Sequence, residues 1–150
     1  MDQVAIWIPL AVGVGALAAT ILIHALAVAA TVNLVRREVR VGRAGAGFWT
    51  DVTIVVAAIS FALGAHLLEI AVWAVLFMVC GEFPEFGLAC YHSAVNYTTL
   101  GYGDIVMTAS WKFLGPLEAA NGLLLFGVST ALVFAVIQRL VHARFAEFRA

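Results

Sequence analysis

The sequence predicts an all-α membrane protein with three transmembrane helices and a re-entrant helix and loop between the second and the third. Of its 150 residues, 64% are hydrophobic and 11% are charged, and the mean hydropathy is +1.04. A soluble globular domain is nearer to half apolar and a quarter charged, so the composition excludes that class. Three segments exceed the about 20 apolar residues that cross a bilayer. A polar, glycine-rich run lies between the last two of them.

The first apolar segment, Val4–Val35, carries no charged residue. It is too long for the apolar part of a signal peptide, and the residues before it are not basic. We therefore predict that residues 1–35 form a retained, additional N-terminal transmembrane helix. Small residues on one face predict close packing against a neighbouring helix: Ala11, Gly15 and Ala19.

The second segment, Val52–Cys80, carries two polar groups, His66 and Glu69, which are three residues apart and share a helix face. A lone charge at this depth in a bilayer is costly, so each group is expected to have a partner. The candidates are each other, His24 of the first segment, and a polar residue of the outer segment such as Asn96. The pattern is compatible with a structural hydrogen-bonded pair, a pH sensor or a metal site.

The third segment, Phe113–Ile137, carries Glu118 and Asn121, which lie one turn apart near its start. Ionisable residues inside a membrane usually face protein or water and not lipid. We expect Glu118 to reach toward the glycine-rich run. The alternative is a position shallow enough to reach bulk water.

Arginines predict the orientation of the chain. They occur only between the first two segments, at 36–43, and after the third, at 139–149. Basic loops stay in the cytoplasm, which places the N-terminus and residues 81–112 outside and the C-terminus inside. We expect an integral protein of a bacterial inner membrane in this orientation.

The outer segment, residues 81–112, does not read as a simple surface loop. After a turn at Gly81–Glu85, apolar residues recur at helical spacing from Phe86 to Thr98. Residues 98–104 then read TTLGYGD. Non-helical backbone at membrane depth survives only where it is buried in protein or lines a water-filled path. The backbone of this run is therefore predicted to line such a path.

Backbone carbonyls can replace the hydration oxygens of a cation without adding a fixed charge. Pointing successive carbonyls to one side requires backbone angles that alternate in sign, and Gly101 and Gly103 have the spacing for this. The Thr99 hydroxyl can add an oxygen at the inner end, and Tyr102 is expected to point away from the path and brace it. One chain cannot encircle an ion, so several copies must meet on an axis.

The run Thr98–Asp104 resembles the selectivity-filter signature of potassium channels, with Leu100 where valine or isoleucine is commoner. The resemblance implies a homotetramer that conducts K⁺ passively. The carbonyls of Thr99, Leu100, Gly101 and Tyr102 would hold the ion and Gly103 would complete the filter backbone, with Thr98 and Asp104 as support. A weakly selective cation channel and a non-conducting subunit that assembles with other channels are the alternatives.

The resemblance covers residues 52–141. It implies an outer helix at 52–80, a pore helix at 86–98, a filter at 99–103 and an inner helix at 113–141. K⁺ is the permeant ion and no organic cofactor is expected. Membrane lipid surrounds the protein, with no nucleic-acid partner and no soluble ligand-binding domain expected. No nucleophile–base set or phosphate-binding motif suggests an enzyme.

The chain departs from the common pattern behind the filter. Val95 stands where many relatives have glutamate or another polar group, and His92 where an aromatic such as tryptophan is often found. Glu118 is the candidate to replace the polar group missing at Val95. Cys80 and Cys90 are expected either to form an extracellular disulfide or to remain two buried thiols.

Two glycines of the inner helix, Gly122 and Gly127, are candidates for a gating hinge, with Gly127 preferred. The alternative is close helix packing, for which membrane helices commonly use small residues.

Overall fold

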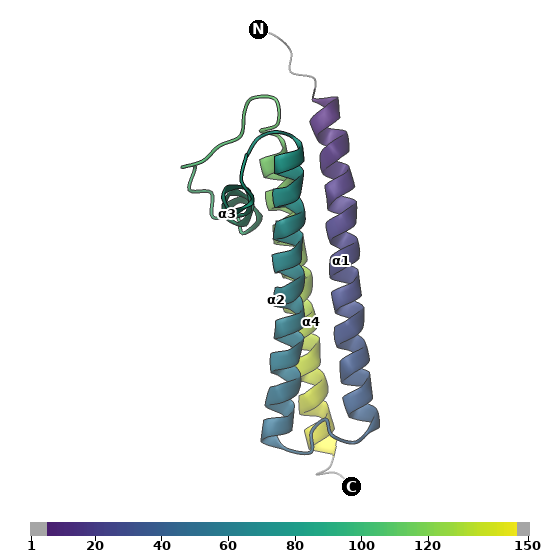
Figure 1. Cartoon of the computed structure of the whole chain (residues 1–150). Coiled ribbons are helices and arrows are strands. Elements are labelled where there is room, and N and C mark those ends of the chain that lie inside the picture. The colour runs from purple at the N-terminus through teal and green to yellow at the C-terminus, as the bar shows by residue number, and fades with distance from the viewer. Residues whose placement is uncertain (1–5, 147–150) are drawn as a thin grey trace. The chain divides into compact units, whose positions relative to one another are not determined.

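The computed structural model describes residues 6–146, which form four α-helices and no strand (Figure 1). These are α1 (Trp7–Arg40), α2 (Phe48–Val79), α3 (Phe86–Tyr97) and α4 (Leu114–Ala146). Three of them, α1, α2 and α4, are long and apolar enough to cross a membrane. The predicted all-α membrane fold is therefore confirmed.

The long helices extend beyond the apolar segments. Helix α1 continues to Arg40, α2 begins at Phe48, four residues before the predicted start, and α4 continues to Ala146. Hydropathy marks the part of a helix that lies in hydrocarbon, whereas backbone hydrogen bonds continue into the interface. Helix α1 ends where Gly42 and Gly45 adopt positive φ angles of 71° and 85°.

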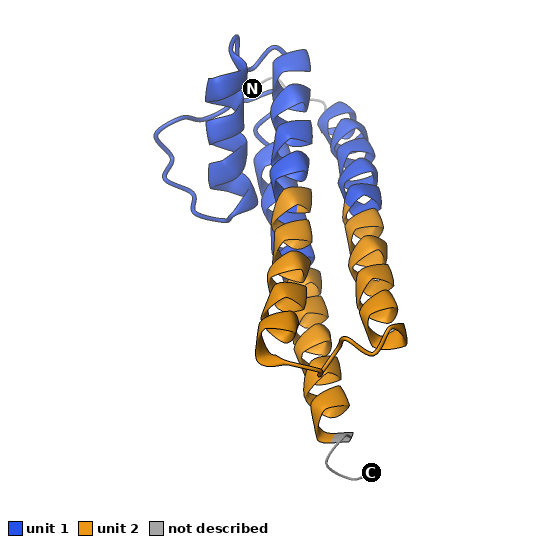
Figure 2. Cartoon of the chain, turned by 60° about the horizontal axis from the view of Figure 1, so that its bottom comes forward, with its two compact units in different colours: residues 1–23, 66–126 blue, residues 24–65, 127–150 orange. Residues whose placement is uncertain are grey.

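The chain divides into two compact units (Figure 2). Unit 1 contains residues 1–23 and 66–126, and unit 2 contains residues 24–65 and 127–150. In unit 1, α3 and the loop after it fold back beside α2 (Figure 1). The largest fully buried side chains of this unit join α2, α3 and α4: Trp73, Phe77, Tyr97 and Leu114. This core holds α3 in place by burying apolar area.

Unit 2 has a smaller core, formed by α2 and α4. Its buried residues are Ile54, Ala58, Val136 and Leu140, and Val35 of α1 and Ala44 of the connecting loop pack against them. The loop between α1 and α2 therefore packs against the helices through Ala44.

The row of small residues predicted to pack on α1 is not the face that packs within the described part of this chain. The row Ala11, Gly15 and Ala19 is exposed, and Gly15 has no atom within 4 Å of an added Cβ. The buried face runs instead through Gly13 and Thr20. An added Cβ at Gly13 would lie 2.6 Å from Cδ1 of Leu117 in α4. Both faces carry small residues, so hydropathy alone cannot show which face packs against α4.

Candidate functional site

The glycine-rich run begins with the hydrogen bonds that end α3. The N–H of Thr99 donates to the carbonyl of Asn96 at 2.8 Å, and the N–H of Leu100 donates to the carbonyl of Val95 at 2.9 Å. With Thr98 as the C-cap residue, this is the pattern of a Schellman motif. The position after the cap must then be left-handed, and Thr99 has a φ angle of 60°.

Threonine is an unusual choice for this position. Glycine normally occupies it, and a β-branched residue with positive φ is a genuine outlier. Such conformations cost about 1–3 kcal/mol and cluster at functional sites. At position 99 a glycine would adopt this φ angle without strain. Threonine adopts it at a cost in free energy, and it places a hydroxyl group at the start of the run. Sequence reasoning assigned Thr99 a hydroxyl role and missed its backbone angle, which the helix-cap position alone could have suggested.

The backbone angles of the run alternate as the glycine spacing predicts. Gly101 and Gly103 have φ angles of 61° and 71°. Together with Thr99, every second residue from 99 to 103 is left-handed, whereas Leu100 and Tyr102 are not. Alternation of this kind is the condition for turning successive carbonyl oxygens toward one side. The arrangement offers neutral oxygens, which suit a partly dehydrated cation.

Two contacts hold the outer end of the run to α3. The hydroxyl of Tyr91 donates to Asp104 at 2.8 Å. The His92 Nδ1–H donates to the carbonyl of Ile105 at 3.1 Å, and its Nε2 accepts from the Asn96 amide at 2.8 Å. These contacts require the neutral ring with its proton on Nδ1. Asp104, predicted as filter support, is thus anchored by Tyr91, a partner that the sequence did not single out.

The ring of His92 occupies an aromatic pocket. Its centroid lies 5.4 Å from that of Phe77 and 4.8 Å from that of Phe83. Burial lowers the pKa of His92, although Ile105 and the nearby carboxylates of Glu82 and Asp104 act in the opposite direction. The imidazole therefore fills the place of an aromatic side chain and adds two directed hydrogen bonds.

A carboxylate clamp ties the turn before α3 to the segment after the run. Glu82 accepts from the backbone N–H of Thr108 at 2.7 Å and from its hydroxyl at 2.5 Å. Both carboxylate oxygens are used, so Glu82 has a structural role. Neighbouring Glu85 is exposed and makes no side-chain cap contact with α3.

Glu118 lies behind α3. Its side chain is fully buried and accepts a hydrogen bond from the hydroxyl of Ser93. Ser93 also contacts the carbonyl of Ile70 at 2.9 Å, so one serine joins α2, α3 and α4. Val95 is itself buried and apolar. The carboxyl group that contacts α3 is therefore supplied by α4, and the role of Glu118 in supporting the run stays a prediction.

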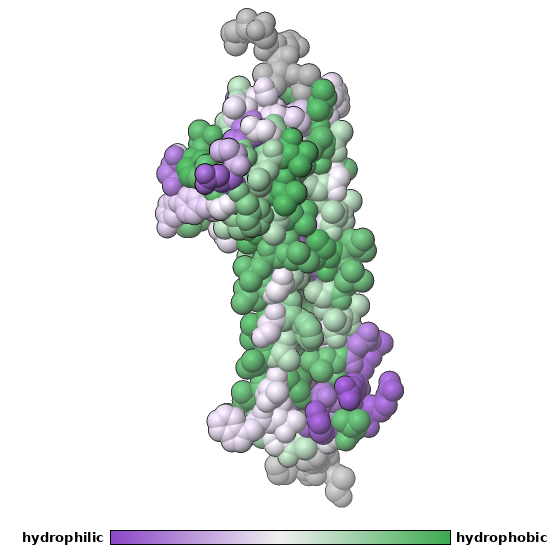
Figure 3. All heavy atoms as spheres, viewed as in Figure 1, coloured by the Kyte–Doolittle hydropathy of each residue, from purple (hydrophilic) through white to green (hydrophobic). Residues whose placement is uncertain are grey.

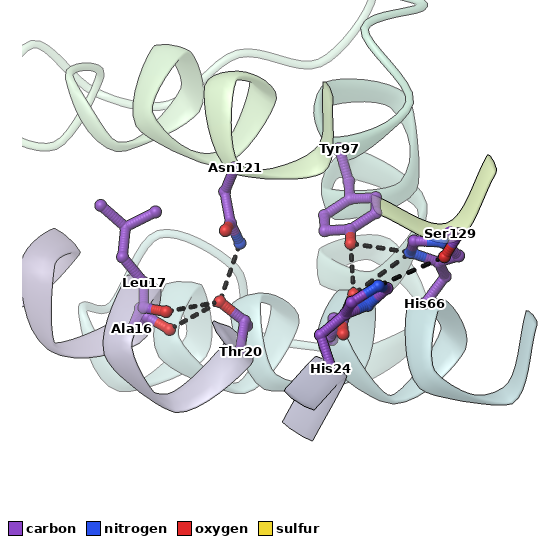
Figure 4. Close-up of polar contacts among 9 residues, drawn as sticks. Ala16, Leu17, Thr20, His24, His66, Tyr97, Asn121 and Ser129 are labelled. Atoms are coloured by element: carbon purple, nitrogen blue, oxygen red, sulfur yellow. Dashed lines mark hydrogen bonds and ion pairs between the residues drawn. The ribbon is translucent and has the colours of Figure 1, made fainter. Parts of the chain in front are cut away.

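His66 and Glu69 form a buried cluster with Tyr97, the last residue of α3 (Figure 4). The Tyr97 hydroxyl donates to Glu69, and His66 Nδ1 lies 3.2 Å from Glu69 and 3.0 Å from the Tyr97 oxygen. Phe126 packs against the His66 ring with centroids 4.2 Å apart. Of the candidate partners, His66 and Glu69 contact each other, and the α3 residue that contacts both of them is Tyr97, which was not among the residues named.

The two glycines of α4 differ in their surroundings. An added Cβ at Gly122 would lie 2.0 Å from the carbonyl oxygen of Tyr97, whereas nothing lies within 4 Å at Gly127. Close packing therefore explains Gly122. No packing contact explains Gly127, and its role as a hinge stays a prediction.

Polar contacts also join α1 to α4 within each unit (Figure 4). In unit 1, the Asn121 amide donates to the hydroxyl of Thr20 at 2.8 Å. In unit 2, the Ser129 hydroxyl lies 3.3 Å from Nε2 of His24. The N-terminal helix thus contacts the helix predicted to line the path.

Cys80 and Cys90 are free thiols, and both are half-buried. Burial, helped by nearby Glu82, raises the pKa of the Cys80 thiol. The thiolate, which is the reactive form, is therefore disfavoured at Cys80.

A family profile described as "Ion channel" matches residues 65–139, half of the chain. The chain belongs to this ion channel family. No curated protein and no solved structure matches it. The matched part of the channel includes α3, the glycine-rich run and each contact that anchors them. Helix α1 lies outside the match. Membership points to ion transport and not to catalysis.

Proposed function

We propose that four copies of this chain form a potassium-selective channel. In this channel the carbonyls of Thr99, Leu100, Gly101 and Tyr102 bind K⁺ in the filter, and Gly103 ends it. The Thr99 hydroxyl contributes the innermost oxygen. With three candidate membrane helices per chain, the assembly of four copies has twelve.

The observation that carries this proposal is the alternation of φ from Thr99 to Gly103 directly after α3. The Schellman motif fixes where the alternation starts, and Tyr91–Asp104 fixes where it ends. Four copies on an axis supply the ring of oxygens that replaces a hydration shell.

The proposed orientation is the one that the arginines favour, with the filter outside and the loop between α1 and α2 in the cytoplasm. The membrane would be the inner membrane of a bacterium. Helix α3 then points its C-terminal, partially negative end into the path, which favours a cation.

Flux through purified protein in liposomes tests the proposal. We expect K⁺ and Rb⁺ to pass far better than Na⁺, and Ba²⁺ to block. Equal permeability to Na⁺ and K⁺ would instead support a weakly selective cation channel. Absence of flux from a correctly assembled tetramer would support a non-conducting subunit.

Native mass spectrometry tests the assembly separately. The expected species has four times the mass of the chain, which is 16.0 kDa. Monomers or dimers alone, in a detergent that preserves flux, would refute the tetramer without touching the family assignment.

A further inference from the structure

The arginines of unit 2 fall into two groups. Arg43 pairs with Glu38 at 2.7 Å, and Arg144 pairs with Asp51 at 2.7 Å. Among residues 6–146, no carboxylate lies within ion-pair distance of the remaining described arginines, which are Arg36, Arg37, Arg40 and Arg139. All four are exposed, and two of them, Arg36 and Arg139, also line a groove.

These two arginines share one groove between α1 and α4. The groove has a volume of about 330 Å³. Its other lining residues are apolar and come from both helices: Val32, Val35, Val39, Leu132, Ala135 and Val136. Figure 3 shows hydrophilic side chains gathered at the last turns of α1, next to an apolar surface. A phospholipid has apolar acyl chains and a charged phosphate. An apolar cleft that carries two guanidinium groups is complementary to such a molecule.

The groove lies between two helices that are long and apolar enough to span the membrane, so it is surrounded by lipid. Guanidinium groups bind phosphate through paired, charge-assisted hydrogen bonds. Basic pockets between membrane helices on the cytoplasmic side are suited to anionic head groups. A zwitterionic lipid would bring a choline or amine that two unpaired arginines repel.

We propose that this groove binds an anionic phospholipid. One acyl chain lies along the valines of α1 and the apolar residues of α4, and the phosphate lies between Arg36 and Arg139. The bound lipid would connect α1, which lies outside the channel domain, to the inner helix. The site does not depend on which ion the channel conducts.

Lipid retention in native mass spectrometry tests the site. The full-length protein is mixed in detergent with phosphatidylglycerol or phosphatidylcholine of identical acyl chains. We expect the unmodified protein to retain phosphatidylglycerol preferentially. The double variant Arg36→Gln/Arg139→Gln should bind it about 30-fold more weakly, since each basic residue near an anionic surface contributes about a factor of five.

The matched control is Arg37→Gln/Arg40→Gln, which removes the same charge from arginines that do not line the groove. This control should change retention far less. Equal losses in the two double variants would show general charge attraction and overturn the proposal. Equal retention of phosphatidylcholine by the unmodified protein would overturn it as well.

A second variant tests whether the apolar part of the groove binds an acyl chain, and it does so without changing the charge of the protein. Ala135→Leu narrows the groove and should lower phosphatidylglycerol retention, whereas Ala131→Leu, one turn away and outside the groove lining, should not. If the double arginine variant fails to assemble, the comparison of Ala135→Leu with Ala131→Leu tests the proposal by itself. Unchanged retention in Ala135→Leu would indicate that the groove is closed by protein, and the proposal would then be wrong.

Discussion

The carboxylate of Asp51, in the first turn of α2, accepts a hydrogen bond from Nη2 of Arg144, near the end of α4, at 2.7 Å. The same carboxylate accepts the backbone N–H of Gly45 at 2.8 Å. An added Cβ at Gly45 would lie 2.8 Å from the backbone nitrogen of Arg144. One acidic residue therefore holds the loop between α1 and α2 against the end of α4.

Removing this charge should loosen that attachment. We expect Asp51→Asn to lower the free energy of unfolding by about 1–3 kcal/mol, because hydrogen bonds to a charged group contribute about this much when partly buried. Thermal unfolding of the detergent-solubilised protein measures it. In an Arg144→Gln background the same change should cost clearly less. If Asp51→Asn lowers the free energy of unfolding as much in the Arg144→Gln background as in the unmodified protein, Asp51 and Arg144 do not interact.

In the proposed channel, adding one methyl group to the glycine-rich run should abolish its function. Gly101 has a φ angle of 61° and open space around an added Cβ, with the nearest atom at 4.0 Å. The cost of Gly101→Ala is therefore backbone strain alone, about 1–2 kcal/mol. We expect loss of K⁺ selectivity or of flux in liposomes. Gly127→Ala, in a helix with open space, is the control and should keep selectivity.

Gly122→Ala and Gly127→Ala separate packing from hinge motion. At Gly122 the new Cβ would meet the Tyr97 carbonyl at 2.0 Å, so α3 and α4 must move apart. Overpacking of this kind costs about 1–3 kcal/mol or more. We expect Gly122→Ala to reduce the yield of assembled protein in size-exclusion chromatography. Gly127→Ala should assemble normally, and a hinge at this position would show as a changed open probability in single-channel recordings.

The lowered pKa of His92 predicts that acid destabilises the outer segment. Its ordinary pKa is about 6.5, so the unfolded chain binds a proton at a pH where the folded chain does not. The free energy of unfolding is therefore not reduced by this histidine above about pH 6.5. It decreases as the pH falls from there toward the pKa that His92 has in the folded protein. Protonation also removes the acceptor that Asn96 uses.

Thermal unfolding between pH 5 and pH 8 measures this effect. His92→Gln keeps hydrogen-bonding capacity without a titrating group and should flatten the profile in this range. A profile that is equally steep in the variant would assign the pH dependence to other groups.

The two glutamates before α3 should behave differently although they are three residues apart. Glu85 is exposed, so Glu85→Gln should lower K⁺ conductance at low salt by weakening the local attraction of cations, and the effect should vanish at high salt. Glu82 clamps Thr108, so Glu82→Gln should lower thermal stability at every salt concentration. Identical salt dependence of conductance in both variants would contradict this division.

Periodicity and hydropathy were sufficient to predict the element types and the position of the glycine-rich run. Those signals are local and strong, because long apolar segments and a seven-residue motif each carry their own evidence. Helix ends were less accurate, since the helices continue past the apolar residues to Arg40 and Ala146. The backbone angle of Thr99 was missed because sequence statistics favour glycine there.

Contacts between distant segments could not be predicted. Tyr97 meets Glu69 across 28 residues, and Asn121 meets Thr20 across 101. Each choice depends on which face of a nearly uniform apolar helix turns inward, and the sequence offers several equivalent faces.

The cap of α3 has a consequence for how long an ion stays near the helix. The Val95 carbonyl accepts N–H groups from both Leu100 and Gly101, at 2.9 and 3.2 Å, and the Ala94 and Asn96 carbonyls accept from Thr98 and Thr99. These oxygens already accept hydrogen bonds, which weakens them as ligands for a cation. In the proposed channel, α3 therefore acts on a cation mainly through the field of its C-terminal end. Such a helix end draws ions in without prolonging their residence, which rapid throughput requires.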